Sequence, residues 1–135
     1  MARYGMNVKI HGDLEGVKNK LIEALKTQGF GILTEIDMQK TLKQKIGADL
    51  PPYQILGACN PRFAYRALSA DEDIGLLLPC NVILKQDGDE VAVSIQDPEV
   101  MFSVVDDETK NAMADLPSEV KRSLQAALEA LKKVD

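Results

Sequence analysis

The chain has 135 residues, of which 45% are hydrophobic and 27% charged, and this length and composition suit one globular domain with its own core. Its 16 basic and 21 acidic residues give a net charge of −5, which argues against binding to nucleic acid or to an anionic membrane surface, because both attract basic proteins. No stretch approaches the roughly 20 apolar residues of a membrane helix, and two cysteines are too few for a disulfide framework. We therefore expect a cytoplasmic protein with a single domain over residues 1–135.

The first part of the chain predicts strands and helices in alternation. Apolar alternation and short apolar runs indicate three strands, over residues 4–10, 30–36 and 53–59. Two helices separate these strands, and each opens at an aspartate that can cap it and closes at a glycine: Asp13 to Gly29 and Asp37 to Gly47. In the shorter helix we expect three apolar side chains to point into the core: Met38, Leu42 and Ile46.

A third helix and a hairpin are predicted next. Asn60-Pro61 is typical of a helix start, since an asparagine caps the helix and a proline suits its first position. We expect the inner face of this helix to hold Phe63, Ala64, Ala67 and Leu68. Asp87-Gly88 then indicates a hairpin turn between two further strands, over residues 82–86 and 90–96.

The chain ends in helical segments. Short helical turns over residues 98–114 precede a helix that runs from Pro117 to about Val134. The apolar stripe of this last helix is Val120, Leu124, Ala127, Leu128, Leu131 and Val134. Five expected strands and several helices, without a linker or a repeat, predict one α+β domain.

Standard motifs for phosphate-binding loops, zinc proteases, serine hydrolases and Cys-x-x-Cys sites are absent from the sequence. His11 is the one histidine and falls between the first strand and the first helix, where it can act as a base or a ligand but has no partner at metal-ligand spacing. Two acidic groups, residues 71–73 and 106–108, lack the spacing of a calcium loop and are typical of solvated turns. We predict no metal site and no cofactor.

Both cysteines precede an asparagine, in Cys59-Asn60-Pro61 and Pro79-Cys80-Asn81. Cys59 ends a strand just before a helix N-terminus, where the helix dipole favours a thiolate. If the two strands are neighbours, the thiols can lie close together in one cleft. The alternative is purely architectural, because free cysteines are commonly buried and Asn60 is a good helix cap.

The two cysteine segments and their surroundings resemble the domain-of-unknown-function 302 family. The resemblance is carried by residues 55–61 (Ile-Leu-Gly-Ala-Cys-Asn-Pro) and 74–82 (Ile-Gly-Leu-Leu-Leu-Pro-Cys-Asn-Val), and it extends over roughly residues 6–134. It implies a small bacterial or archaeal α+β domain of the TATA-binding-protein-like class, with a curved, mostly antiparallel or mixed sheet of about five strands and helices on one side. It also implies homodimers, and sulfur or haem redox settings for some relatives. The motif positions that carry over are Cys59, Asn60, Pro61, Pro79, Cys80 and Asn81.

Three functional hypotheses follow. The first is a homodimeric small-molecule-binding protein whose pocket is lined by the two Cys-Asn segments, with thiol redox chemistry if one thiol has a lowered pKa. The second is a non-enzymatic structural or interaction module, which predicts buried, inert cysteines and an exposed apolar patch. The third is a haem-binding protein that uses His11 or a methionine as ligand. None of the three involves nucleic acid or a membrane.

Overall fold

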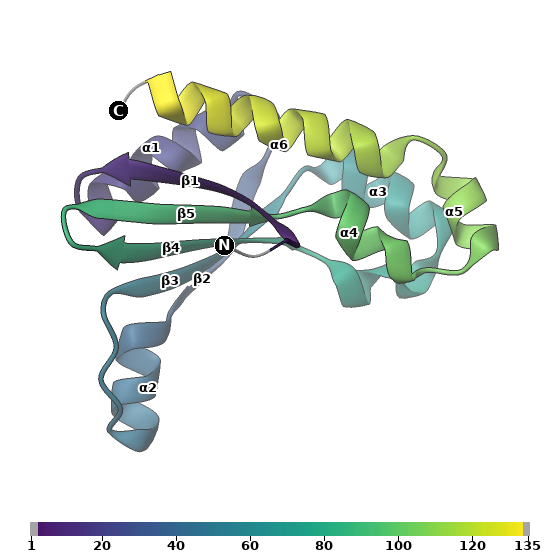
Figure 1. Cartoon of the computed structure of the whole chain (residues 1–135). Coiled ribbons are helices and arrows are strands. Elements are labelled where there is room, and N and C mark those ends of the chain that lie inside the picture. Colours follow the sequence, from purple (N-terminus) through teal and green to yellow (C-terminus); the bar gives the residue numbers. More distant parts are fainter. Residues whose placement is uncertain (1–2, 134–135) are drawn as a thin grey trace.

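The computed structural model describes residues 3–133, which fold around one five-stranded antiparallel sheet (Figure 1). Its strand order is β1-β5-β4-β3-β2, and every neighbouring pair is antiparallel. The five strands are β1 (Gly5–His11), β2 (Gly31–Asp37), β3 (Tyr53–Cys59), β4 (Cys80–Asp87) and β5 (Glu90–Gln96). Each lies within two residues of its predicted bounds, and the α+β fold is confirmed.

Helical segments connect and cover the strands. The α-helices are α1 (Leu14–Lys26), α2 (Met38–Ile46), α3 (Pro61–Ala70), α4 (Pro98–Met101), α5 (Asp107–Met113) and α6 (Leu116–Lys133). The chain also contains two short 3₁₀ helices, η1 (Glu72–Leu77) and η2 (Phe102–Val104). The side chains of Asp13, Asp37 and Asn60 accept hydrogen bonds from the first turns of their helices, as the sequence predicts.

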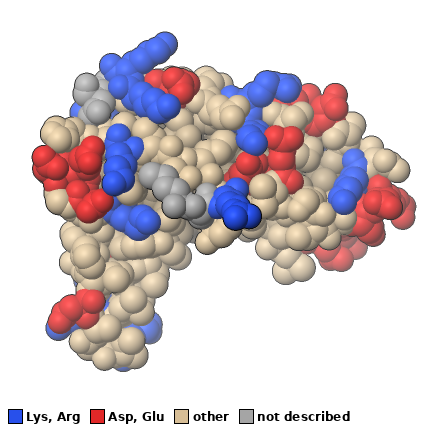
Figure 2. All heavy atoms as spheres, in the orientation of Figure 1, with Lys and Arg blue, Asp and Glu red and all other residues tan. Residues whose placement is uncertain are grey.

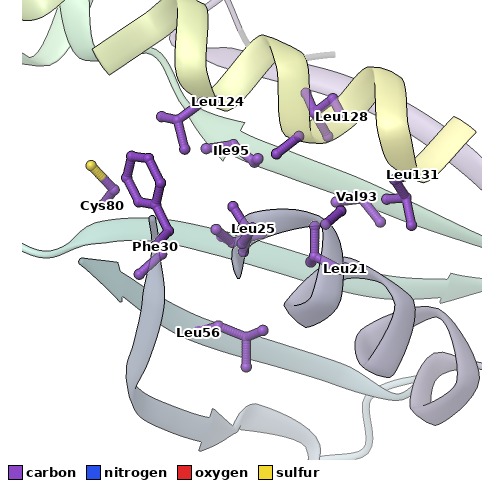
Figure 3. Close-up of a cluster of buried hydrophobic side chains, with 14 of the residues drawn as sticks. Leu21, Leu25, Phe30, Leu56, Cys80, Val93, Ile95, Leu124, Leu128 and Leu131 are labelled. Atoms are coloured by element: carbon purple, nitrogen blue, oxygen red, sulfur yellow. The ribbon is translucent and has the colours of Figure 1, made fainter. Parts of the chain in front are cut away.

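The core lies between the sheet and the helices α1 and α6, which pack together over one face (Figure 1). Figure 3 shows leucines of both helices meeting side chains of β3 and β5, with Phe30 and Cys80 at one border of the cluster. The apolar stripe of α6 is buried as predicted from Val120 to Leu131, while Val134 falls outside the described residues. This single layer of helices explains why residues of β4 and β5 alternate between buried and more exposed.

The opposite face of the sheet carries no helix among residues 3–133 (Figure 1). Strand pairing places Ile36, Ile55 and Ile83 side by side across β2, β3 and β4 on this face. Ser94 continues the row on β5, where its hydroxyl hydrogen-bonds the side-chain carbonyl of Asn7 on β1. The uncovered face is therefore apolar in its centre and polar toward β1.

The predicted apolar face of α2 is wrong, and that of α3 is wrong at one position, Leu68. None of the residues of α2 is buried, and Ile46 is 74% exposed, because this helix projects from the body away from α1 and α6 (Figure 1). On α3, Ala67 is buried but Leu68 is 43% exposed. Helical spacing identifies an apolar stripe, but it does not say how much of that stripe another element covers.

Candidate functional site

The junction between β3 and α3 is held by the side chain of Asn60. Its Oδ1 accepts hydrogen bonds from the backbone N–H groups of Arg62 (3.1 Å) and Phe63 (3.4 Å), which caps α3. Its Nδ2 donates to the carbonyl oxygen of Gln28 at 3.1 Å. One side chain therefore joins the turn after α1 to the start of α3, which is an architectural role.

The second cysteine segment packs against β3 through Pro79. Gly57 lies beneath Pro79, and a Cβ atom on this glycine would fall 2.7 Å from Pro79 Cγ and closer still to Thr34 Oγ1. Because a side chain does not fit there, the glycine permits the close approach of three segments. The peptide bond between Leu78 and Pro79 is cis.

Both cysteines line one small apolar cavity of about 20 Å³ between β3, β4, α3 and α6. Its other lining residues are Phe30, Ala58, Asn60, Phe63, Ala64, Ala67, Leu78, Pro79, Phe102, Leu116 and Val120. A volume of this size has room for about one water molecule. The structure thus brings Cys59, Asn60, Pro79 and Cys80 together, but around a gap much smaller than a ligand pocket.

Burial dominates the electrostatics of both thiols. It raises the pKa of Cys80 to about 11, with a further contribution from the nearby Cys59 and a partial offset from the side chain of Gln96. Burial also raises the pKa of Cys59, which is half-buried. Since the thiolate is the reactive form, both shifts act against nucleophilic chemistry at neutral pH.

The remaining motif positions do not join this cavity. Asn81 follows Cys80 on β4, so its side chain points to the uncovered face of the sheet. Pro61 occupies the first position of α3 and is exposed. His11 lies at the opposite end of the sheet, where its Nε2 is 3.5 Å from Asp89 Oδ2. The predicted convergence of both Cys-Asn pairs therefore holds for the cysteines and Asn60 but not for Asn81.

The acidic groups cap helical turns. Asp71 accepts a hydrogen bond from the backbone N–H of Asp73, and its other oxygen accepts one from the Thr109 hydroxyl. Asp106 caps α5, and the hydrogen bonds from Thr109 lower the pKa of that carboxyl. Residues 3–133 contain no cluster of three or more His, Cys, Asp or Glu side chains suited to a metal ion, and no helix among them is long and apolar enough to cross a bilayer.

A broad concavity lies on the uncovered face of the sheet and has a volume of about 920 Å³. We call it the groove. Its floor comes from β1, β5, β4 and the start of β3, one end is bounded by residues 50–52, and another side by Met101 of α4. Side chains that line it include Tyr4, Asn7, Lys9, Tyr53, Asn81, Ile83, Lys85, Ala92, Ser94 and Gln96.

Sequence reasoning missed the groove because its residues come from five separate segments. One signal was available: the even-numbered positions of β5 alternate with its buried valines, so Ala92, Ser94 and Gln96 had to share a face. The alternation predicts that β5 has a second, more exposed face, but it does not predict which strands lie beside that face. Only strand order shows which side chains of β1, β3 and β4 lie beside them.

Comparison with known proteins agrees with the architecture. The family model "Domain of unknown function DUF302" matches residues 6–131. The chain belongs to the DUF302 family. A crystal structure of an uncharacterized conserved DUF302 protein from Bacillus stearothermophilus is similar to this DUF302 chain, with a TM-score of 0.85 and 26% sequence identity over 96% of this chain and 99% of that chain. No curated protein matches the DUF302 chain.

Proposed function

We propose that this protein is a non-enzymatic binding module and that the groove is its binding surface. The observation that carries the proposal is the groove itself, a concavity of about 920 Å³ over a sheet face that no helix of residues 3–133 covers. Binding sites are characteristically concave, largely apolar surfaces with a few polar groups, and a volume in the range of about 300–1,000 Å³ is typical.

The lining of the groove suits a partner with apolar surface. Tyr4, Tyr53 and Met101 belong to residue types that are enriched where proteins bind other molecules. Ile83 lies in the centre of the floor, and the hydrogen-bonded pair of Asn7 and Ser94 lies toward β1. An apolar centre with polar groups on one side favours one orientation of the bound molecule over another.

The cysteine cavity supports a catalytic function less well than the groove supports a binding function. Its volume of about 20 Å³ excludes any ligand larger than water without rearrangement. The raised pKa values of Cys59 and Cys80 keep both thiols protonated at neutral pH. A haem site has no geometric support either, because His11 lines neither the cavity nor the groove.

The proposal is tested with Nile red, an uncharged fluorescent dye that binds apolar surfaces. At submicromolar protein concentration we expect saturable binding with one dye per chain. Ile83→Glu places a carboxylate in the floor of the groove and is expected to weaken dye binding at least about tenfold, because a charge buried under an apolar ligand loses its hydration.

Two matched variants serve as controls for the dye measurement. Leu76→Glu introduces the same charge at a position that is 88% exposed and outside the groove, so it should leave dye binding unchanged. The double substitution of Cys59 and Cys80 by alanine should leave it unchanged as well. Binding that is absent, or that is insensitive to Ile83→Glu, contradicts the proposed function.

A further inference from the structure

Strand pairing places two lysines on either side of a small residue in the floor of the groove. Ala92 of β5 pairs with Lys9 of β1 on one side and with Lys85 of β4 on the other, and all three residues line the groove. Two strand spacings of about 4.8 Å separate the backbones of the lysines by about 10 Å, and each ammonium group stands on a flexible stem of four carbons. Both ammonium groups can therefore reach one anion above Ala92.

The two lysines differ in their partners. Lys9 Nζ lies 3.3 Å from Oδ2 of Asp87, which supplies the one carboxylate among the described residues that line the groove. Lys85 is exposed and forms no ion pair with any residue in the range 3–133. With two lysines and one aspartate, this lining carries a single net positive charge, although the chain as a whole has a net charge of −5.

Other polar side chains of the groove already have partners within the chain. The Ser94 hydroxyl donates to Asn7 Oδ1, and Asn7 Nδ2 donates to the carbonyl oxygen of Gly5 at 3.2 Å. Gln86 Nε2 donates to three backbone carbonyl oxygens at the hairpin end of the sheet. Lys85 is therefore the charged group in the groove that remains available to a ligand.

The surroundings of the lysines favour one direction for an apolar ligand chain. Toward the β4–β5 hairpin the next residues across the strands are Asp87 and Glu90. Figure 2 shows acidic side chains at the tip of this hairpin, basic side chains beside them, and a largely uncharged surface from there toward α2. In the opposite direction the floor continues with Ile83, and Met101 bounds the groove. An apolar chain attached to the anion thus gains contacts by running away from the hairpin.

The floor is long enough for such a chain. Four residues of β5, from Ala92 to Gln96, span about 14 Å at about 3.4 Å each. A medium-chain fatty acid fits within this length, and the volume of about 920 Å³ exceeds what it needs.

From these features we propose that the ligand of the groove is an organic carboxylate with an apolar chain, of the medium-chain fatty acid class. Its carboxylate lies above Ala92 between Lys9 and Lys85, and its chain runs over Ile83. A head group with one negative charge matches the single net positive charge of the lining. The proposal rests on the proposed function, since it names the ligand of the same surface.

NMR titrations compare octanoate with octan-1-ol, which has the same chain and no charge. We expect octanoate to shift the amide signals of Ala92 and Ile83 and to bind at least about fivefold more tightly than octanol. Lys85→Met removes the ammonium group but keeps an apolar stem, so it should weaken octanoate binding about fivefold and leave octanol binding unchanged. Lys45→Met, at an exposed position of α2 outside the groove, is the matched control and should change neither.

Asp87→Asn provides a test in the opposite direction. It removes the carboxylate that competes with the ligand for Lys9, so it should tighten octanoate binding about threefold and leave octanol binding unchanged. A role of these charged residues in folding alone does not predict tighter binding of one ligand.

Three results would overturn the proposal: octanoate that binds no more tightly than octanol, Lys85→Met protein that binds octanoate like wild type, or Asp87→Asn protein that binds it more weakly. The Nile red measurement keeps these results separate from the proposed function, because the dye is uncharged. If the dye binds the groove while octanoate and octanol bind equally, the groove is a binding surface without preference for a carboxylate, and only the ligand class is wrong. If neither the dye nor octanoate binds, the proposed function and the ligand class are both wrong.

Discussion

Gly57 illustrates how a single position fixes the contact between the two cysteine segments. It lies in β3 beside Thr34 of β2 and beneath Pro79, which precedes β4. Its backbone torsion angles are ordinary for a strand, so the requirement for glycine comes from space and not from a left-handed conformation. The motif that carries the family resemblance is therefore explained, at this residue, by close packing.

We predict that Gly57→Ala lowers the free energy of unfolding by about 1–3 kcal/mol, because the added methyl group forces Pro79 or Thr34 to move. Urea denaturation followed by circular dichroism measures the change. Gly75→Ala is the control, since a Cβ atom there meets nothing within 4 Å, and it should change the stability by less than about 0.5 kcal/mol. Equal effects of the two substitutions would contradict the packing argument.

The cysteines differ from activated thiols in the direction of their pKa shifts. Desolvation is the largest cause at both Cys59 and Cys80, and it favours the neutral form. The dipole of α3 does not reverse this effect at Cys59, although that residue lies just before the helix. The sequence argument identified the dipole but had no measure of burial.

The raised pKa of Cys80 predicts a loss of stability at high pH. The thiol ionises near 9.0 in the unfolded chain and near about 11 in the folded chain, so its contribution is fully present below pH 9 and is lost as the pH rises toward 11. We expect the free energy of unfolding to fall across this interval in wild type and to fall less in Cys80→Ala. Urea denaturation at several pH values checks the difference.

Alkylation by iodoacetamide tests the same environment directly. In single-cysteine variants at pH 7, both thiols should react more slowly than a cysteine in an unfolded peptide, and the buried Cys80 more slowly than Cys59. Labelling of either thiol faster than the peptide would show an activated cysteine and would reopen the redox hypothesis.

At the scale of elements, α2 and α6 have similar patterns and opposite environments. Both helices carry apolar residues at helical spacing and lysines in the last turn. The stripe of α6 is buried against the sheet and α1, whereas α2 contacts mainly β2 and β3 and has no buried residue. Amphipathic spacing thus has two meanings in one chain: a core contact in α6 and an uncovered surface in α2.

We predict that the two helices respond differently to truncation of an apolar side chain. Leu124→Ala in α6 removes a fully buried side chain (0% exposed) and should cost about 2–5 kcal/mol of stability. Ile46→Ala in α2 should cost less than about 0.5 kcal/mol in dilute, monomeric protein. Urea denaturation compares them, and a large cost at Ile46 under these conditions would show that this face of α2 packs within its own chain.

On the scale of the whole molecule, the antiparallel sheet has one face covered by helices and one face open. The covered face holds the core, which includes Cys80, while the next residue, Asn81, belongs to the open face. Alternation along a strand makes such a split between adjacent residues unavoidable. Cys80 and Asn81 therefore cannot line the same site, because both lie in β4.

Local sequence patterns determine most of the secondary structure of this protein. The five strands, the capped helix starts, the Asp-Gly hairpin and the buried stripe of α6 each depend on residues within a few positions of one another, so the sequence identifies them without the rest of the fold. The two cysteine segments likewise indicate the family, because a family is recognised from the order of residues along the chain and does not require the fold.

Tertiary structure alone decided what surrounds each element. The groove combines side chains from strands that are distant in sequence, and the burial of Cys80 and the exposure of Ile46 depend on which helices reach which face. A periodic pattern indicates that a surface is apolar. The hydrophobic free energy gained by burying that surface is the same whether this chain or another molecule buries it. For that reason the sequence predicts apolar faces, and only the folded arrangement shows which of them remain open.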